Sequence, residues 1–325
     1  MPSLRGAARC SIVLPAVVGS LLLAACGAAA GPGANEPIKV AVLRQPHLFH
    51  PYFYERFLPN GRRVQMVPFS DSTEIKNAVN TGSADFGVTG ITSALQGAAA
   101  GESFRVLASA ADGGSAIVAG GQSGIASVGA LRGKRIGYVP GSAQDILLRL
   151  TLRRAGIDPE NQVELINVGF SDMVDALRGG SIDAFSGAEI GPSNAISSGA
   201  RLVTRPYGTP MGKINIVLGT SQDLIDDQPG LVREVVAAHV KAVDYMRSNK
   251  REWADASADA YGFEPGVVRA AIDNIEPRST IDARYIDQAR VLGDQLRAEE
   301  QMRGTPDYDE FIDESFVRQA TGGSR

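Results

Sequence analysis

The chain has 325 residues, of which 44% are hydrophobic and 21% are charged. This is the balance of a soluble globular protein, long enough for two lobes with sizeable cores. The formal net charge is −4 and only 6% of the residues are aromatic, which argues against a nucleic-acid partner because such partners select basic surface patches.

The first 25 residues are predicted to be a signal peptide. Arg5 and Arg9 precede an apolar stretch that is too short to span a bilayer. The sequence Leu23-Ala24-Ala25-Cys26 follows, and it resembles the lipobox of bacterial lipoproteins, in which the cysteine is lipidated. The only other cysteine, Cys10, lies in the part that would be removed, so Cys26 has no disulfide partner in the mature chain. We expect a lipid anchor on Cys26; an ordinary signal peptide with an incidental cysteine is the alternative.

Residues 26–37 are small and rich in glycine and proline, which predicts a flexible tether. The apolar, β-branched run Ile38–Leu43 then predicts a strand, which ends in a polar and aromatic loop. Ligands of open α/β sheets bind beyond the carboxyl ends of strands, so the loop supplies three candidate ligand residues, Gln45, His47 and Tyr52. His47 and His50 lack a third metal-ligating neighbour, and we expect no metal.

The next units each lead from a strand into a helix that starts with hydroxyl residues. Val64–Pro68 is predicted to be a strand followed by a helix that Ser72 or Thr73 caps. The strand at residues 85–88 leads into another such helix start. Hydroxyls at a helix start that faces a cleft can also hold a ligand, which makes candidates of Ser72, Thr89, Gly90 and Thr92.

One short pattern occurs twice, as Gly82-Ser83-Ala84-Asp85 and as Gly180-Ser181-Ile182-Asp183. In each copy a helix ends at a glycine that can adopt positive φ, and the Ser and Asp side chains can bond the backbone of the turn. A repeated helix–turn–strand unit predicts two similar α/β lobes facing each other across a ligand cleft. Chance recurrence of a common turn is the alternative.

A further α/β unit is predicted to open at residues 131–139 and to lead into the helix start Gly141-Ser142-Ala143. Ser142 and Asp145 are spaced as in a capping box. The free N–H groups of this start and the positive end of the helix dipole favour an anion, so Gly141, Ser142 and Ala143 are candidates. Simple capping without a ligand is the alternative.

Glycine-rich or polar segments near residues 112–114 and 213–215 are predicted to carry the chain between the lobes, and Ser115 and Asn215 beside them are further ligand candidates. Glu189 follows the second repeat and offers a charge that suits an amine or a ring N–H. The alternative is that Glu189 points to solvent or caps a turn.

No strand is expected after Gly219, and the remaining helices are expected to pack on the first lobe, with Asp282 and Asp307 as caps and His239 in the core. The predicted bounds are 38–114 plus 215–320 for the first lobe and 115–214 for the second. Residues 321–325 are predicted to be a disordered tail.

The order of these elements resembles the substrate-binding lipoproteins of ABC importers of the nitrate, sulfonate and taurine class, including binders of thiamine pyrimidine precursors. Four segments carry the resemblance, at residues 82–90, 131–137, 141–143 and 177–183. The resemblance implies a two-lobed, periplasmic-binding-protein-like α/β fold of type II, with mostly parallel sheets flanked by helices. It also implies a monomer without cofactor, anchored on the outer face of the cytoplasmic membrane, which passes a small ligand to a permease.

Two other functions stay open. An enzyme on the same fold, such as a pyrimidine-precursor synthase or a small-acid lyase, would need a nucleophile, a metal or an acid/base pair. No cysteine besides Cys26 and no Ser-His-Asp arrangement stands out in the mature chain, so we expect no enzyme. A lipoprotein that senses its ligand without transporting it is the other possibility.

Overall fold

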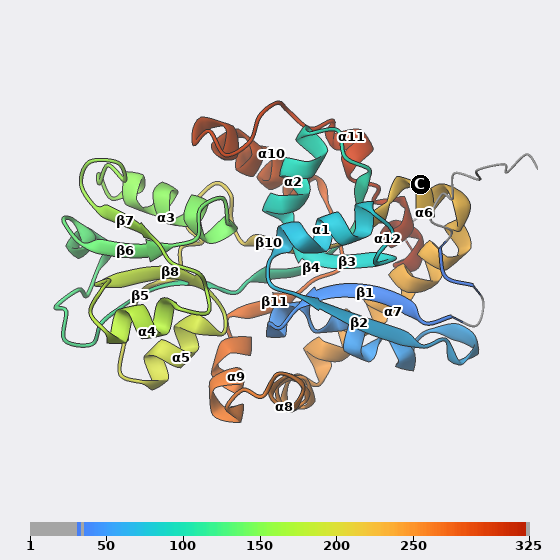
Figure 1. Ribbon diagram of the computed structural model, residues 1–325, viewed down its shortest axis with the longest axis horizontal. Helices are drawn as coiled ribbons and strands as arrows, with labels where there is room; N and C mark the ends of the chain where they lie inside the picture. Colours follow the sequence, from blue (N-terminus) through green and yellow to red (C-terminus); the bar gives the residue numbers. More distant parts are fainter. Residues whose placement is uncertain (1–30, 34–35, 323–325) are drawn as a thin grey trace, which may run out of the picture.

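A computed structural model describes residues 31–33 and 36–322 of the chain. The described chain forms two β-sheets, each covered by helices, that lie side by side in Figure 1. The predicted signal peptide and Cys26 lie outside the described residues. Among the helices that are described, none is both long and apolar enough to cross a membrane.

The first sheet has the strand order β11-β4-β10-β3-β1-β2. Its strands are β1 (Ile38–Leu43), β2 (Val64–Phe69), β3 (Phe86–Gly90), β4 (Phe104–Gly113), β10 (Ile214–Ser221) and β11 (Ile275–Pro277). Strand β1 pairs in parallel with β2 and β3, whereas β10 is antiparallel to β3 and β4, and β11 is antiparallel to β4. The strands β1 to β4 therefore all run in one direction, and the sheet as a whole is mixed.

The second sheet repeats this plan on a smaller scale, with the order β7-β6-β8-β5-β9. Its strands are β5 (Ser115–Ala119), β6 (Arg135–Tyr138), β7 (Glu164–Asn167), β8 (Ala184–Ala188) and β9 (Arg201–Thr204). Strand β6 is parallel to β7 and β8, and β5 is antiparallel to β8 and β9. Only β5 runs against the other described strands of this sheet.

The repeated Gly-Ser-x-Asp pattern occupies equivalent places in the two sheets. Gly82 and Gly180 have φ of 71° and 73°, the positive values expected at these helix ends. The Asp carboxylates bond a neighbouring strand and not their own turns: Lys39 N of β1 donates to Asp85 Oδ2 at 2.7 Å, and Arg135 N of β6 donates to Asp183 Oδ2 at 2.9 Å. Each Asp thus joins the turn after a helix to a neighbouring parallel strand of its own sheet, β1 for Asp85 and β6 for Asp183.

Helices cover both sheets. The first sheet is flanked by α1 (Ser72–Asn80), α2 (Ile91–Ala99), α6 (Gln222–Asp227), α7 (Pro229–Ser248), α8 (Lys250–Tyr261), α9 (Pro265–Ile272), α10 (Ala283–Ala298), α11 (Tyr308–Phe311) and α12 (Ser315–Ala320), with the 3-10 turns η1 (Pro46–Leu48), η2 (His50–Arg56) and η3 (Pro59–Gly61). The second is flanked by η4 (Val128–Leu131), α3 (Ala143–Arg154), α4 (Met173–Arg178) and α5 (Gly191–Ser197). Helix α7 buries an apolar stripe at helical spacing, which seats it on the first lobe.

Two expectations for the C-terminal part had different outcomes. Asp282 and Asp307 cap α10 and α11 as predicted. The prediction that no strand follows Gly219 is wrong, because β10 continues to Ser221 and Ile275–Pro277 pairs with β4. Three residues between two helices are too few to show the alternation that marks a strand.

The chain passes from the first sheet to the second between β4 and β5 and returns between β9 and β10. Gly113 and Gly114, at the first crossing, have φ of 80° and 73°. A Cβ on Gly113 would lie 2.6 Å from the carbonyl oxygen of Asn274, so this crossing needs glycine for both its conformation and its close packing.

The main apolar core fills the first lobe and extends to Ala143, Ile146 and Leu147 of α3. Two smaller apolar clusters belong to the second lobe. Helix α10 contacts both α2 and α3, and α9 contacts α5, as their places in Figure 1 indicate. The C-terminal helices thus pack on the first lobe and also reach the second.

The ends of the described chain differ from the sequence expectation. Pro32, in the predicted tether, is buried, and a Cβ on Gly31 would meet Leu224 of α6. Thr321 N and Oγ1 bond the carbonyl oxygen of Val317 at 3.0 and 2.9 Å. Thr321 therefore ends α12 in an ordered turn, while residues 323–325 of the predicted tail lie outside the described residues.

Candidate functional site

A cavity of about 980 Å³ is lined by residues of both lobes. From the first lobe come the ends of β1 and β2 and the starts of α1 and α2. From the second come the residues that follow β6, β7 and β8. These positions lie beyond the carboxyl ends of strands, where the sequence placed its ligand candidates.

Five described helices, α1 to α5, begin at or next to residues that line this cavity. The first N–H groups of a helix lack partners within the helix, and the helix dipole adds positive potential there. Asp71 and Ser142 cap α1 and α3, and the carboxylate of Glu189 accepts from Ser193 N in the first turn of α5. The N-cap of α2, Gly90, supplies no side-chain cap. The wall therefore favours a negatively charged or strongly hydrogen-bond-accepting group.

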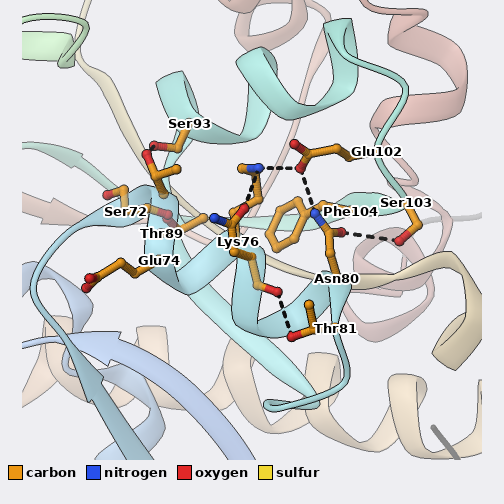
Figure 2. A network of polar contacts seen from close by, with 12 residues as sticks. Ser72, Glu74, Lys76, Asn80, Thr81, Thr89, Ser93, Glu102, Ser103 and Phe104 are labelled. Carbon is orange, nitrogen blue, oxygen red and sulfur yellow. Dashed lines mark hydrogen bonds and ion pairs between the residues drawn. The ribbon is translucent and has the colours of Figure 1, made fainter.

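The starts of α1 and α2 are tied together by hydroxyl groups. Gly90 N donates to Ser72 Oγ at 3.1 Å, Thr89 Oγ1 donates to Ser72 O at 2.9 Å, and Thr73 Oγ1 lies 3.4 Å from Ser93 Oγ. Figure 2 shows Ser72, Thr89 and Ser93 together at this junction. The predicted cap of α1 is corrected: the cap is Asp71, which accepts from Thr73 N at 2.7 Å and from Glu74 N at 2.9 Å.

A partly buried ion pair joins α1 to the segment between α2 and β4. The ammonium of Lys76 on α1 pairs with Glu102 before β4. Asn80 Nδ2 donates to Glu102 Oε2 at 2.6 Å, and Ser103 Oγ donates to Asn80 Oδ1 at 3.2 Å, as Figure 2 shows. The hydroxyl-lined wall of the first lobe is therefore held in place by a fixed network rather than by a mobile loop.

The start of α3 satisfies most of its own polar groups. Ser142 Oγ accepts from Asp145 N at 3.1 Å and donates to the Val139 carbonyl at 2.7 Å, and Gly141 N donates to Asp145 Oδ2 at 3.1 Å. Gly141 and Ser142 line the cavity, whereas Ala143 is buried in the core. Ser142 therefore caps α3 and also belongs to the cavity wall.

Two arginines and two carboxylates complete the charged lining. An Arg44 guanidinium N–H donates to the Tyr261 carbonyl at 2.6 Å. Arg178 pairs with Asp175 at 3.0 Å but keeps 62% of its side chain exposed, and Asp71 is engaged as the cap of α1. Of the two arginines in the wall, Arg178 thus has more freedom to turn toward a ligand, because Arg44 is held by the Tyr261 carbonyl.

Of the residues proposed from sequence, five line the cavity: Gln45, Ser72, Thr92, Gly141 and Ser142. The hydroxyl of Thr92 makes no side-chain hydrogen bond among the described residues, which leaves it available to a ligand. The remaining candidates lie behind the wall or at the crossings. They are His47, Tyr52, Thr89, Gly90, Ser115, Ala143, Glu189 and Asn215.

Glu189 lies between two lining residues but turns its carboxylate inward. Ser193 N donates to Glu189 Oε2 at 3.2 Å and Asn274 Nδ2 donates to Oε1 at 3.1 Å. Burial raises the pKa of this carboxyl, and the bonds from Ser193 and Asn274 oppose that rise. Glu189 thus caps the first turn of α5, the alternative weighed from sequence, and links the second lobe to the segment before β11.

Ser115 and Asn215 make hydrogen bonds within and beside the two segments that connect the lobes. Asn215 Nδ2 donates to the Gly113 carbonyl at 2.6 Å, and Gln144 Nε2 donates to Ser115 Oγ at 3.0 Å. Ser115 N donates to the hydroxyl oxygen of Tyr207 at 2.8 Å. Their side chains therefore stabilise the connection between the lobes.

His47 and Tyr52 are used in the packing of the first lobe. His47 is 2% exposed, and burial lowers its pKa to about 3. Tyr52 stacks on Phe49 with ring centroids 4.2 Å apart. Within the described part of the chain, no group of His, Cys, Asp and Glu is arranged to hold a metal ion.

The lining residues that the sequence reasoning missed include two arginines and three phenylalanines: Arg44, Phe69, Phe170, Arg178 and Phe263. A signal existed for Phe69 and Phe170, because Phe69 ends β2 and Phe170 follows β7 closely. The rule that ligands bind beyond strand ends applies to them as it does to the hydroxyl residues. Phe263 carried no such signal, because it follows a helix.

Two mixed α/β lobes, joined by two crossings around a cavity, define the periplasmic-binding-protein-like class of fold. The alkanesulfonate-binding protein SsuA of Xanthomonas axonopodis pv. citri, solved with bound MOPS, shares it. Its TM-score is 0.75 at 20% identity, and the alignment covers 87% of this chain and 99% of that chain. The desulfurization enzyme DSZB shares it too, with a TM-score of 0.67 at 17% identity over 89% of this chain and 99% of that one.

A sequence model of the family described as NMT1/THI5 like matches residues 57–252. Because this match spans more than half of the chain, the protein belongs to that family. A Bacillus subtilis (strain 168) protein with the provisional name of an aliphatic sulfonates-binding protein is 26% identical, over 95% of this chain and 96% of that protein.

Proposed function

We propose that this protein is the extracytoplasmic solute-binding lipoprotein of an ABC importer, and that it binds a small anionic organic solute or oxyanion of the sulfonate, taurine or nitrate kind. The observation that carries the proposal is the cavity between the lobes, at whose wall five described helices begin. Full-length similarity to a protein named for aliphatic sulfonates supports it. So does the shared fold of a protein solved with MOPS, which is itself a sulfonate.

Binding in this arrangement needs no covalent chemistry. The anionic group of the solute accepts hydrogen bonds from backbone N–H groups at the uncapped start of α2 and from the hydroxyl of Thr92, while Arg178 balances its charge. Because the wall comes from both lobes, a bound solute bridges them and favours the closed arrangement. The closed protein is the form that the permease receives.

A solute screen by thermal shift and calorimetry tests the proposal. We expect sulfonates, nitrate or taurine to raise the melting temperature, with amino acids and neutral pyrimidines as comparisons. Thr92→Val keeps the shape of the side chain and removes the hydroxyl, so it should weaken binding of the best anion by about 1 kcal/mol, roughly fivefold. Thr204→Val on β9, far from the cavity wall, is the matched control. Absence of binding by every anion would refute the proposal.

An enzyme on this fold is the alternative, and DSZB shows that the fold supports one. The position of the histidines favours binding over catalysis, because His47, His50 and His239 are buried in the first lobe and none lines the cavity. Incubation of the protein with its tightest ligand, followed by mass spectrometry, separates the two functions. A binding protein returns the ligand unchanged.

Lipid anchoring at Cys26 belongs to the proposal, with Leu23-Ala24-Ala25-Cys26 as its support. Residues 1–25 would be removed, 26–37 would tether the domain, and the lobes would comprise 38–114 plus 215–320 and 115–214. In a bacterial host, Cys26→Ser should move the protein from the membrane fraction to the soluble or secreted fraction. A mutant that still sediments with membranes would exclude the anchor. Deletion of a neighbouring permease gene, followed by uptake measurements, distinguishes transport from ligand sensing.

A further inference from the structure

Three phenylalanine side chains line the cavity, and they come from both lobes. Phe69 ends β2, Phe263 follows α8, and Phe170 lies between β7 and α4. All three are half-buried: Phe69 and Phe263 pack at the edge of the core of the first lobe, and Phe170 packs at the edge of a cluster in the second. Part of each ring therefore stays exposed at the wall.

These rings are not paired with one another. Phe263 has Tyr261 as an aromatic neighbour, with ring centroids 5.8 Å apart, and no aromatic pair within the described chain involves Phe69 or Phe170. Other aromatic rings of the first lobe are packed together, such as Phe49 with Tyr52, Phe53 and Tyr261. Apolar ring surface exposed in a cavity is stabilised when a ligand covers it, and a ligand ring covers it best.

Each of the three rings adjoins a polar part of the wall. Phe69 precedes the start of α1 and Phe170 precedes the start of α4. Phe263 is near Arg44, whose guanidinium bonds the carbonyl of Tyr261. Asp71 engages the first N–H groups of α1, so the donors beside the rings are the guanidinium groups of Arg44 and of Arg178 on α4. An apolar body and an anionic group can therefore be held together.

The size of the cavity also favours a ligand with a substantial body. Its volume is about 980 Å³. A water molecule occupies roughly 30 Å³, so nitrate or a one-carbon sulfonate would displace few waters and leave the rings uncovered. Cavities of roughly 300–1,000 Å³ suit ligands of many more atoms.

We propose that the solute is an aromatic organic anion, with its ring against Phe69 and Phe263 of the first lobe and Phe170 of the second, and its anionic group at the helix starts. The inference rests on the proposed function and narrows its ligand class. Closure then brings phenyl rings of both lobes onto one ligand ring, so the ring itself joins the two lobes.

Calorimetry with three matched probes tests the inference on the wild-type protein: methanesulfonate, cyclohexanesulfonate and benzenesulfonate. We expect benzenesulfonate to bind at least about tenfold more tightly than methanesulfonate, and more tightly than cyclohexanesulfonate, because aromatic pairs add stabilisation beyond the area they bury. Phe170→Leu should weaken the binding of benzenesulfonate by about fivefold. It should change the affinity for methanesulfonate by no more than about twofold. Phe57→Leu is the control, because Phe57 packs on Tyr245 and does not line the cavity.

The outcomes separate this inference from the function on which it rests. If either methanesulfonate or cyclohexanesulfonate binds as tightly as benzenesulfonate, the proposal of an aromatic ligand is overturned, while the proposal of anion binding stands. If benzyl alcohol binds and none of the sulfonates does, the anionic site is overturned. Binding of no probe at millimolar concentration overturns both. The comparison among the probes uses the wild type, so it holds even where a phenylalanine variant fails to fold.

Discussion

All three histidines of the chain are buried in the first lobe. The ring of His50 lies 5.0 Å from that of His239. His239 bonds Tyr54 Oη and the Ser109 carbonyl, each at 2.8 Å, whereas neither ring nitrogen of His50 has a hydrogen-bond partner among the described residues. Burial lowers the pKa of His47 to about 3 and that of His239 to about 4. Burial lowers the pKa of His50 as well, and the neighbouring His239, His47 and Arg247 add to this effect.

These lowered pKa values predict loss of stability in acid. Between the folded values and about 6.5, the unfolded chain binds protons that the folded chain does not, so the free energy of unfolding falls as pH falls. Each histidine contributes about 1.4 kcal/mol per pH unit in that range. Burial raises the pKa values of Asp85, Asp112 and Glu189, and these carboxyls oppose the trend because they gain protons in the folded state.

Replacing one histidine separates its contribution to the pH dependence of stability from the contribution of the carboxyl groups. Urea unfolding of His50→Phe at pH 7.5 and pH 5.0 should show a loss of stability about 2 kcal/mol smaller than in the wild type. The control is Phe53→Leu, which lies in the same 3-10 turn as His50 and changes no titrating group. It should keep the wild-type pH dependence of stability. An unchanged pH dependence in His50→Phe would show that His50 is not held neutral by burial.

At the scale of elements, α3 of the second lobe is bound to the end of α10 by a buried polar cluster. Arg149 Nε bonds Asp145 Oδ1 at 2.7 Å, and Arg149 Nη1 bonds Glu299 Oε2 at 3.0 Å. Gln301 Nε2 donates to Asp145 Oδ2 at 2.7 Å. The side chain of Asp145 is fully buried, and those of Arg149 and Glu299 are each 8% exposed. The cluster lies between the lobes, so it stabilises their present arrangement.

Removing one charge of this cluster should cost stability. Glu299→Gln leaves Arg149 with Asp145 but weakens its bond to the first lobe, so we expect unfolding to become easier by about 1–3 kcal/mol. Hydrogen exchange should quicken in α3 and α10. Asp255→Asn removes the exposed partner of Arg269 within the first lobe, and such exposed pairs contribute about 0–1 kcal/mol. Equal effects of the two variants would mean that the cluster adds nothing between the lobes.

At the scale of the whole molecule, two lobes share one cavity and are joined by two crossings. The first crossing depends on glycines with positive φ, and the bond from Asn215 holds it. Such a connection lets the lobes move as units while each keeps its own sheet. A ligand that contacts both lobes favours their closure, whereas the cluster around Arg149 stabilises the arrangement described here.

Ligand binding should therefore change the shape of the molecule as well as its stability. Small-angle scattering should give a smaller radius of gyration with the tightest anion than without it. At 100 times Kd the ligand should add about 2.7 kcal/mol to the free energy of unfolding. In Glu299→Gln the ligand-free radius should exceed that of the wild type. A tight ligand that leaves the scattering profile unchanged would contradict closure.

Features that depend on neighbours along the chain could be predicted from the amino-acid pattern. Gly82 and Gly180 end helices with positive φ, and Ser142, Asp282 and Asp307 cap helices, because these bonds join residues only a few positions apart. The order of strands and helices followed from apolar patterns of the same short range, and it was enough to predict two α/β lobes. The short strand β11 was not predicted, because its pairing partner β4 lies far away in the chain.

Only the tertiary structure decided which candidates face the cavity. Glu189 was chosen for its place in a loop, but Asn274, distant in the sequence, turns its carboxylate inward. His47 followed a strand end as Gln45 does, yet burial within the first lobe removed it from the wall. Phe69, Phe170 and Phe263 line one cavity because two lobes meet there. The direction of a side chain depends on packing against residues far away in the chain. The pattern of neighbouring residues in the sequence does not contain this information.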